Sequence, residues 1–128
     1  ARFADAGYVD DRAWAASKSR SLLQRGYGAG RIAQALAHAG VGEDDRDAVR
    51  VSEADRRRAA LALARKRGFG PFGSDESDRA RRDKQLAAML RAGHAADVAR
   101  YLLAAPTVDA AEEWAAEAWA GEGDEACD

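Results

Sequence analysis

The sequence predicts an all-α protein of tandem three-helix repeats, stacked into an elongated, arched body, and three observations favour this fold class. Alanine occurs 33 times in 128 residues, whereas the β-branched residues Val, Ile and Thr together occur only 8 times, and this composition favours helix over sheet. Short segments that end in glycine recur along the chain, as expected for repeated helix ends. No 12 consecutive residues lack a charge, so a transmembrane helix is not expected.

Two sequence echoes mark the expected helix ends. Residues 3–7 (FADAG), 36–40 (LAHAG) and 89–93 (MLRAG) each place a large apolar residue four positions before a glycine. Residues 25–28 (RGYG) and 67–70 (RGFG) each close a charged segment before a turn. Glycine at these positions relieves the left-handed conformation that ends many helices. The echoes therefore predict that helices stop and restart at similar points in successive units.

The first part of the chain is predicted to hold the end of a first helical repeat, at 1–9, and a central three-helix repeat, at 10–51. The helices of the central repeat are expected at 11–25, 29–39 and 43–51, because apolar residues recur there at helical spacing. The residues expected in its core are Trp14, Ala15, Leu22, Leu23, Ile32, Leu36 and Val49, with Trp14 and Leu36 as the main anchors.

Residues 52–104 are predicted to form a C-terminal three-helix repeat, with helices at 52–66, 77–92 and 95–103. Ser52, followed three residues later by Asp55, resembles a capping box at the start of the first of these helices. The residues expected in the core of this repeat are Ala60, Leu61, Ala64, Leu86, Ala87, Met89, Leu90, Val98 and Leu102.

The last stretch, 105–128, differs from the rest in charge. It holds 8 acidic residues and no basic one, whereas residues 1–104 hold all 20 basic residues and 14 acidic ones. An amphipathic helix is expected at 107–120, followed by a loose tail. Its apolar side is expected to consist of Ala111, Trp114, Ala115 and Ala118. Because its charge opposes that of the body, this stretch is expected to restrain binding of the basic body to phosphates.

No catalytic, metal or cofactor site is predicted, and the protein is not expected to be an enzyme. Cys127 has no second thiol for a disulfide or a metal site. His38 and His94 lack partners at the spacing of a metal site or a catalytic triad, which favours structural or solvated roles. The glycines of 68–73 (GFGPFG) match the spacing of a dinucleotide-binding loop, but a charged helical segment precedes them instead of the required strand.

Basic side chains provide the candidate binding residues. Seventeen of the 20 cations are arginine, whose planar fork suits phosphates and carboxylates. A run of cations is often only a solvated face, and a binding surface is the alternative. The six cations at the two ends of the 52–66 segment and just beyond it are expected to include the principal electrostatic contacts. The candidates are Arg20, Arg25, Arg31, Arg56, Arg57, Arg58, Arg65, Lys66, Arg67, Arg79, Arg81, Arg82 and Lys84.

One ordered combination of residues resembles a known protein family. The segment from Asp10 to Val41 resembles the central repeat of the RecX family, regulatory proteins that modulate the bacterial RecA recombinase. Residues 1–9 resemble the end of the first repeat of that family, and residues 52–103 resemble its third repeat. The acidic stretch after Pro106 departs from its pattern, and so do Ala29 and Gly30. The residues that carry the resemblance are Asp10, Asp11, Trp14, Ala15, Arg20, Gly26, Tyr27, Gly28, Arg31, Ile32, Leu36 and Gly40.

The lack of an expected transmembrane helix or signal-peptide core predicts a soluble, cytoplasmic protein, and we expect it to be monomeric and without a cofactor. The resemblance implies a non-catalytic regulator. Such a protein binds RecA filaments on single-stranded DNA and limits their ATPase, strand exchange and co-protease activity, with electrostatic contacts to single- or double-stranded DNA. Two alternatives from other classes are a helical DNA-binding module and a helical adaptor recognised through its acidic C-terminal helix. The DNA-binding module would read the groove with its second helices, and sequence-specific readout would need side chains there that reach base edges.

Overall fold

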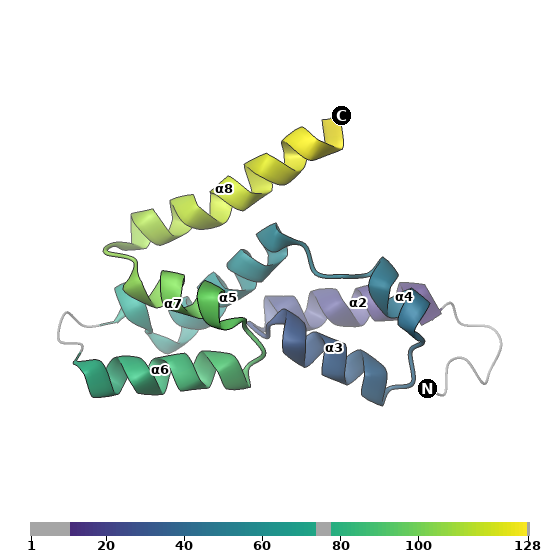
Figure 1. Cartoon of the computed structure of the whole chain (residues 1–128), viewed down its shortest axis with the longest axis horizontal. Coiled ribbons are helices and arrows are strands. Elements are labelled where there is room, and N and C mark those ends of the chain that lie inside the picture. Colours follow the sequence, from purple (N-terminus) through teal and green to yellow (C-terminus); the bar gives the residue numbers. More distant parts are fainter. Residues whose placement is uncertain (1–10, 74–77, 128) are drawn as a thin grey trace.

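The computed structural model describes residues 11–73 and 78–127, with side chains as far as residue 118. Every regular element in these residues is helical, which confirms the all-α fold class. The elements are α2 (Asp11–Gln24), α3 (Ala29–His38), α4 (Glu43–Ala48), α5 (Glu53–Arg67), the 3₁₀ turn η1 (Gly70–Phe72), α6 (Arg79–Arg91), α7 (Ala96–Ala104) and α8 (Val108–Cys127). Figure 1 shows an elongated body with α2, α3 and α4 at one end and α5 to α7 at the other. The predicted end of a first repeat and Asp10 lie outside the described residues.

Side chains cap the helices where the sequence supplies short polar residues. The Ser52 hydroxyl accepts a hydrogen bond from the Asp55 N–H at 3.1 Å, which confirms the predicted cap of α5. The Asp78 carboxylate accepts one from the Arg81 N–H at 2.8 Å at the start of α6. Each bond satisfies a backbone donor that has no partner within the helix. These local contacts fix the helix starts close to their predicted positions.

Four helices end in the same backbone motif, which explains both sequence echoes. Gly26, Gly40, Gly68 and Gly93 all have positive φ angles, between 71° and 98°. The N–H of the residue after each glycine donates to the carbonyl five positions earlier, the pattern of a Schellman motif. The four bonds run from Tyr27 to Leu22, from Val41 to Leu36, from Phe69 to Ala64 and from His94 to Met89, at 2.9–3.1 Å. The predicted helix ends at these glycines are therefore confirmed.

Two clusters of buried side chains form the core. The first joins α2, α3 and the segments around α4, and it consists of Ala15, Leu22, Ile32, Leu36, Val41 and Val51. The second joins α5 to α8, and it consists of Ala60, Leu63, Ala64, Met89, Val98, Ala99, Leu102, Ala111, Trp114 and Ala115. All residues of the first cluster precede Ser52, and all residues of the second follow it. The division into repeats stays a prediction. Within the described residues, no helix has the length and apolar character needed to cross a bilayer.

Several details of the predicted core are wrong. Trp14 is only half-buried and packs at the edge of the first cluster, whereas the smaller Ala15 beside it is fully buried. Leu90 is 43% exposed, because α6 turns its Met89 side toward the other helices. Periodicity predicted the correct helix and the buried Met89, but it added Leu90 to the core and missed Ala88, which is 6% exposed. Leu36 is buried as predicted.

Two helix bounds also differ from prediction. α4 ends at Ala48, and the segment up to Val51 leaves the helix so that the Val51 side chain reaches the first cluster. α8 continues to Cys127, where the sequence predicted a loose tail after residue 120. Glycine within a helix costs only about 1 kcal/mol relative to alanine, and Gly121 and Gly123 do not end this one.

A backbone junction joins the two halves of the molecule. The Gly28 N–H donates to the Ala92 carbonyl at 2.8 Å, and the Gly30 N–H donates to the Gly93 carbonyl at 2.9 Å. A Cβ atom at Gly28 would lie 2.5 Å from the Gly93 carbonyl carbon and oxygen, so only glycine permits this approach. The turn before α3 is therefore held against the turn after α6.

His94 adds a buried side-chain contact to this junction. Its Nε2 atom lies 2.8 Å from the Gly26 carbonyl oxygen, and because a carbonyl only accepts, the Nε2–H donates. Burial lowers the pKa of His94 below its ordinary value of 6.5, and the hydrogen bond to Gly26 only partly opposes this effect. The neutral imidazole is the form that the fold accommodates, which confirms a structural role.

The lowered pKa of His94 predicts a loss of stability in mild acid. The unfolded chain takes up a proton on this residue near pH 6.5, whereas the folded chain does so only at lower pH. The free energy of unfolding should therefore fall as the pH drops below about 6.5, by at most about 1.4 kcal/mol per pH unit. Urea denaturation at several pH values measures this slope. His94→Gln should reduce the slope and His38→Gln, at an exposed position, should keep it; equal slopes would contradict the assignment.

Candidate partner and nucleic-acid surface

Tyr27, in the turn between α2 and α3, is covered by two of the candidate arginines. The guanidinium carbon of Arg25 lies 5.3 Å from the centroid of the Tyr27 ring, and that of Arg31 lies 5.2 Å from it. Cations at this distance are attracted to the ring electrons. The turn that the junction holds in place therefore presents an aromatic ring with two exposed arginines beside it.

Arg57 of α5 faces α8 and makes intramolecular contacts. It donates to the Trp114 carbonyl at 2.7 Å and to the Glu53 carboxylate at 2.9 Å, and it lies 4.0 Å from the Glu117 carboxylate. Its guanidinium also covers the Trp114 ring, 4.9 Å from the centroid. The Trp114 ring stacks in turn on Tyr101, at a centroid distance of 5.1 Å. With only 22% of its side chain exposed, Arg57 helps to dock α8.

The other cations of α5 divide between several environments. Arg65 donates to the Glu112 carboxylate of α8 at 2.6 Å, and Arg58 donates to Asp55 at 3.0 Å within its own helix. Arg56 is half-buried, and its Nε atom lies 3.4 Å from the Val51 carbonyl oxygen. Lys66 is exposed. The acidic residues of α8 thus meet the basic body at Arg57 and Arg65, although restraint of binding by α8 stays a prediction.

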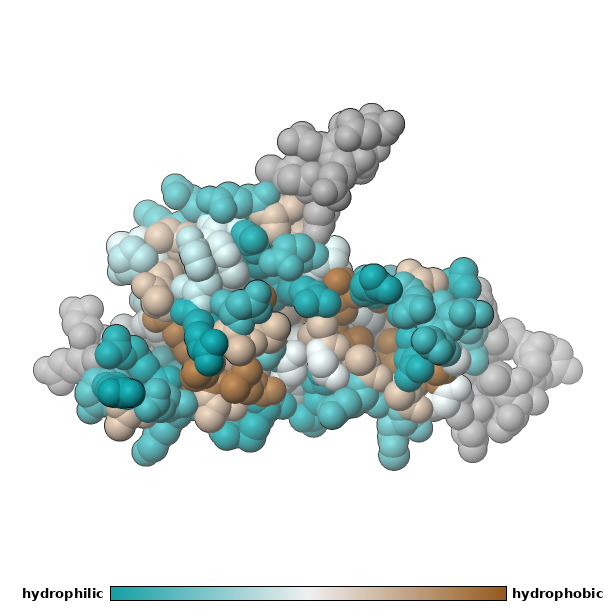
Figure 2. Space-filling model, viewed as in Figure 1, coloured by the Kyte–Doolittle hydropathy of each residue, from teal (hydrophilic) through white to brown (hydrophobic). Residues whose placement is uncertain are grey.

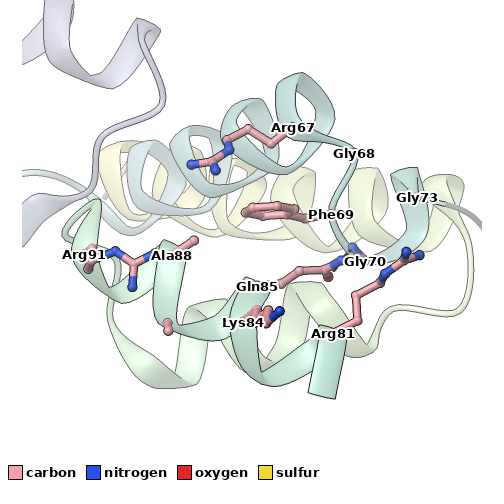
Figure 3. Close-up of a pocket in the computed structure, with 11 residues that line it drawn as sticks. Arg67, Gly68, Phe69, Gly70, Gly73, Arg81, Lys84, Gln85, Ala88 and Arg91 are labelled. Carbon is pink, nitrogen blue, oxygen red and sulfur yellow. Dashed lines mark hydrogen bonds between the residues drawn. The ribbon is translucent and has the colours of Figure 1, made fainter. Parts of the chain in front are cut away.

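A second group of candidate cations converges on one cleft. The cleft has a volume of about 510 Å³ and lies between the end of α5, the η1 turn and α6 (Figure 3). We call it the α5–α6 cleft. Its described lining carries four cations and no carboxylate: Arg67, Arg81, Lys84 and Arg91. In Figure 3, Arg67 lies on one side of the Phe69 ring, whereas Gln85 and Lys84 lie on the opposite side. The structure therefore brings together cations that lie 24 residues apart in the sequence, from Arg67 to Arg91.

The cleft wall is fixed by contacts of the glycine-rich turn. The Gly70 N–H donates to the Gln85 side-chain oxygen at 3.0 Å, and this bond links η1 to α6. Gly70 has a φ of 56°, and a Cβ atom there would lie 3.0 Å from the Leu103 Cα, so the turn lies close against α7. The Arg67 guanidinium lies 5.0 Å from the Phe69 ring centroid. These contacts hold the turn and the Arg67 side chain in defined positions.

The remaining candidates lie apart from the cleft. Arg20 of α2 lies in a groove beside Arg58 of α5, and Arg79 and Arg82 are exposed on α6. The described residues that carry the family resemblance lie in and around α2 and α3, where Ile32 and Leu36 are buried and Arg20 and Arg31 are exposed. Figure 2 shows hydrophilic residues at the ends and margins of one face of the described body, with hydrophobic residues between them in its middle.

Sequence reasoning missed two lining residues of the cleft. Arg91 stands outside the runs of cations that supplied the candidates, and Gln85 is uncharged. The signal for Arg91 was present in the helix end MLRAG, since a cation in the last turn of α6 lies beside the turn that follows. Gln85 could not be found from sequence, because its role depends on the approach of η1 to α6. Among the described residues, no three His, Cys, Asp or Glu side chains lie close enough together to hold a metal ion.

The chain is similar to the regulatory protein RecX of Agrobacterium fabrum (strain C58), with 32% identity over 102 residues. The match covers 80% of this chain and 55% of that protein, so the chain spans about half the length of this relative. The matched length agrees with the extent of the resemblance seen in the motifs. Comparison with models of protein families gave no match. No solved structure matches the chain.

Proposed function

The chain belongs to the RecX family, and on this premise we propose that it is a non-catalytic regulator that binds RecA filaments on single-stranded DNA. Binding would inhibit or modulate the ATPase, strand exchange and co-protease activities of the recombinase. The observation that carries the proposal is the similarity to a regulatory protein over 80% of the chain. The helical body and its exposed cations support it, since a filament presents both protein and phosphate along its length.

The elongated arrangement of the helices suits such a partner. The junction at Gly28 and Gly93 joins the two core clusters through backbone hydrogen bonds, and His94 links them again through its side chain. An elongated body held in this way (Figure 1) can contact neighbouring subunits of a repeating assembly. The exposed cations of α6 and the Tyr27 turn would then lie within reach of the bound strand or of acidic groups on the recombinase.

The test is the DNA-dependent ATPase of the cognate recombinase, measured with increasing amounts of this protein. We expect the rate to fall and to reach a plateau near stoichiometric occupancy of the filament. A second assay without recombinase contains the protein, ATP and single-stranded DNA, and it should show no hydrolysis. ATP turnover by the purified protein alone would contradict a non-catalytic role. An unchanged recombinase rate, together with tight binding to DNA, would favour the helical DNA-binding module instead.

A further inference from the structure

We propose that the α5–α6 cleft is a phosphate-binding site that takes the backbone of a single-stranded nucleic acid. This inference deepens the proposed function, on which it rests for the biological source of the strand. Its basis is the convergence of Arg67, Lys84 and Arg91 on one hollow of about 510 Å³, a size that admits a nucleotide unit. Cations that serve only to solvate a helix surface would not have to line a cleft or come together from two different helices.

The charge balance of the cleft favours an anion. The C-terminal ends of α5 and α6 reach it, and each helix end contributes about −0.5 elementary charge. Arg67, Lys84 and Arg91 outweigh this without any contribution from Arg81. Within the described residues, the side chains of Lys84 and Arg91 form no hydrogen bond or ion pair. Their charges are therefore not neutralised by a described partner, in contrast to Arg57 and Arg65, which pair with α8.

The side chains present the donors that phosphate recognition uses. An arginine fork donates two parallel hydrogen bonds to neighbouring oxygens of one phosphate, and stacking on Phe69 orients the fork of Arg67. The Gln85 oxygen accepts from the Gly70 N–H, which orients the side chain, and its amide nitrogen carries two N–H donors that suit a phosphate oxygen. The floor of the cleft is thus set by backbone and side-chain contacts that exist without a ligand.

A second cationic group lies next to the cleft and distinguishes a strand from a single small anion. The Arg31 backbone lies against Gly93, two residues beyond Arg91: a Cβ atom on Gly93 would lie 2.3 Å from the Arg31 nitrogen. Arg31 and Arg25 flank the ring of Tyr27. Aromatic rings beside arginines, arranged next to a basic groove, are typical of sites for single-stranded nucleic acids. A strand supplies successive phosphates to both groups, whereas a single small anion fills only one.

The test compares two variants that remove the same charge. In the cleft variant, Lys84→Gln is combined with Arg91→Gln; in the control variant, Arg50→Gln is combined with Arg100→Gln, two exposed positions outside the cleft. Binding of a fluorescent 20-nucleotide polythymidine is measured by anisotropy at several salt concentrations, and circular dichroism checks the fold. We expect the cleft variant to lose at least about tenfold in affinity at low salt. Its salt slope should flatten by up to about 1.4, at about 0.7 for each phosphate that the variant no longer neutralises, while the control changes little.

Several results would overturn the proposal. They are an unchanged affinity and slope in the folded cleft variant, an equal loss in both variants, or no binding of the oligonucleotide by the parent. Competition distinguishes the ligand: unlabelled polythymidine should displace the probe, and inorganic phosphate at equal phosphate concentration should not. Displacement by polyglutamate as effectively as by polythymidine would assign the cleft to an acidic protein surface and contradict the proposal. Because these assays contain no recombinase, they fail or succeed independently of the ATPase test.

Discussion

Replacement of Gly93 by serine is expected to lower the free energy of unfolding by about 3 kcal/mol or more. Gly93 has a φ of 98°, a conformation that strains any residue with a side chain. A Cβ atom there would also lie 2.3 Å from the Arg31 nitrogen and 2.6 Å from the Arg31 Cβ. To relieve this overlap, the turn after α6 must move away from α3. Such a movement weakens the hydrogen bonds from Gly28 and Gly30 that join the two core clusters.

Urea denaturation of Gly93→Ser beside Gly42→Ser measures this effect. Gly42 precedes α4 with a φ of −66°, and a Cβ atom there meets nothing within 4 Å. Serine is also a favoured residue at a helix N-cap, so the control should be as stable as the parent or slightly more stable. If Gly93→Ser unfolded at the same denaturant concentration as Gly42→Ser, the close contact between the two halves would be wrong.

Replacement of Trp114 by alanine is the second change expected to have a large effect, with a loss of about 3–5 kcal/mol. Trp114 is 6% exposed within the second core cluster, and it stacks on Tyr101. Its removal also takes away the ring that Arg57 covers and so loosens α8 from α5. The matched variant is Trp14→Ala, because Trp14 is the half-buried tryptophan of the first cluster. Its loss should be smaller, about 1–2 kcal/mol.

Thermal or urea unfolding, followed by circular dichroism, compares the two tryptophan variants. The order of their stabilities is the informative result, since both changes remove the same side chain. A larger loss in Trp14→Ala than in Trp114→Ala would restore the central unit as the main anchor, as the sequence predicted. A negligible loss in Trp114→Ala would show that α8 does not pack on the body in solution.

The candidate site could be predicted only in part, because its members come from different elements. Arg67, Arg81 and Lys84 were found as members of runs of cations, but Arg91 was not, and neither was the cleft that gathers them. Runs of like charge also grouped residues that the fold separates. Arg65 pairs with Glu112 and Arg67 lines the cleft, although they are two residues apart in one helix. The DNA or partner contacts of all these residues stay predictions.

The sequence by itself determined the helical fold class, the Ser52 cap and the glycine ends, because those features depend on contacts within five residues. The bonds from Asp55 to Ser52 and from Phe69 to Ala64 are examples. Only the tertiary structure decided which face of each helix is buried and which cations meet a carboxylate. Arg65 and Glu112 are 47 residues apart, and His94 and Gly26 are 68 apart. Such pairs form where helices cross, and the crossing is set by the packing of all side chains between them, which no local pattern records.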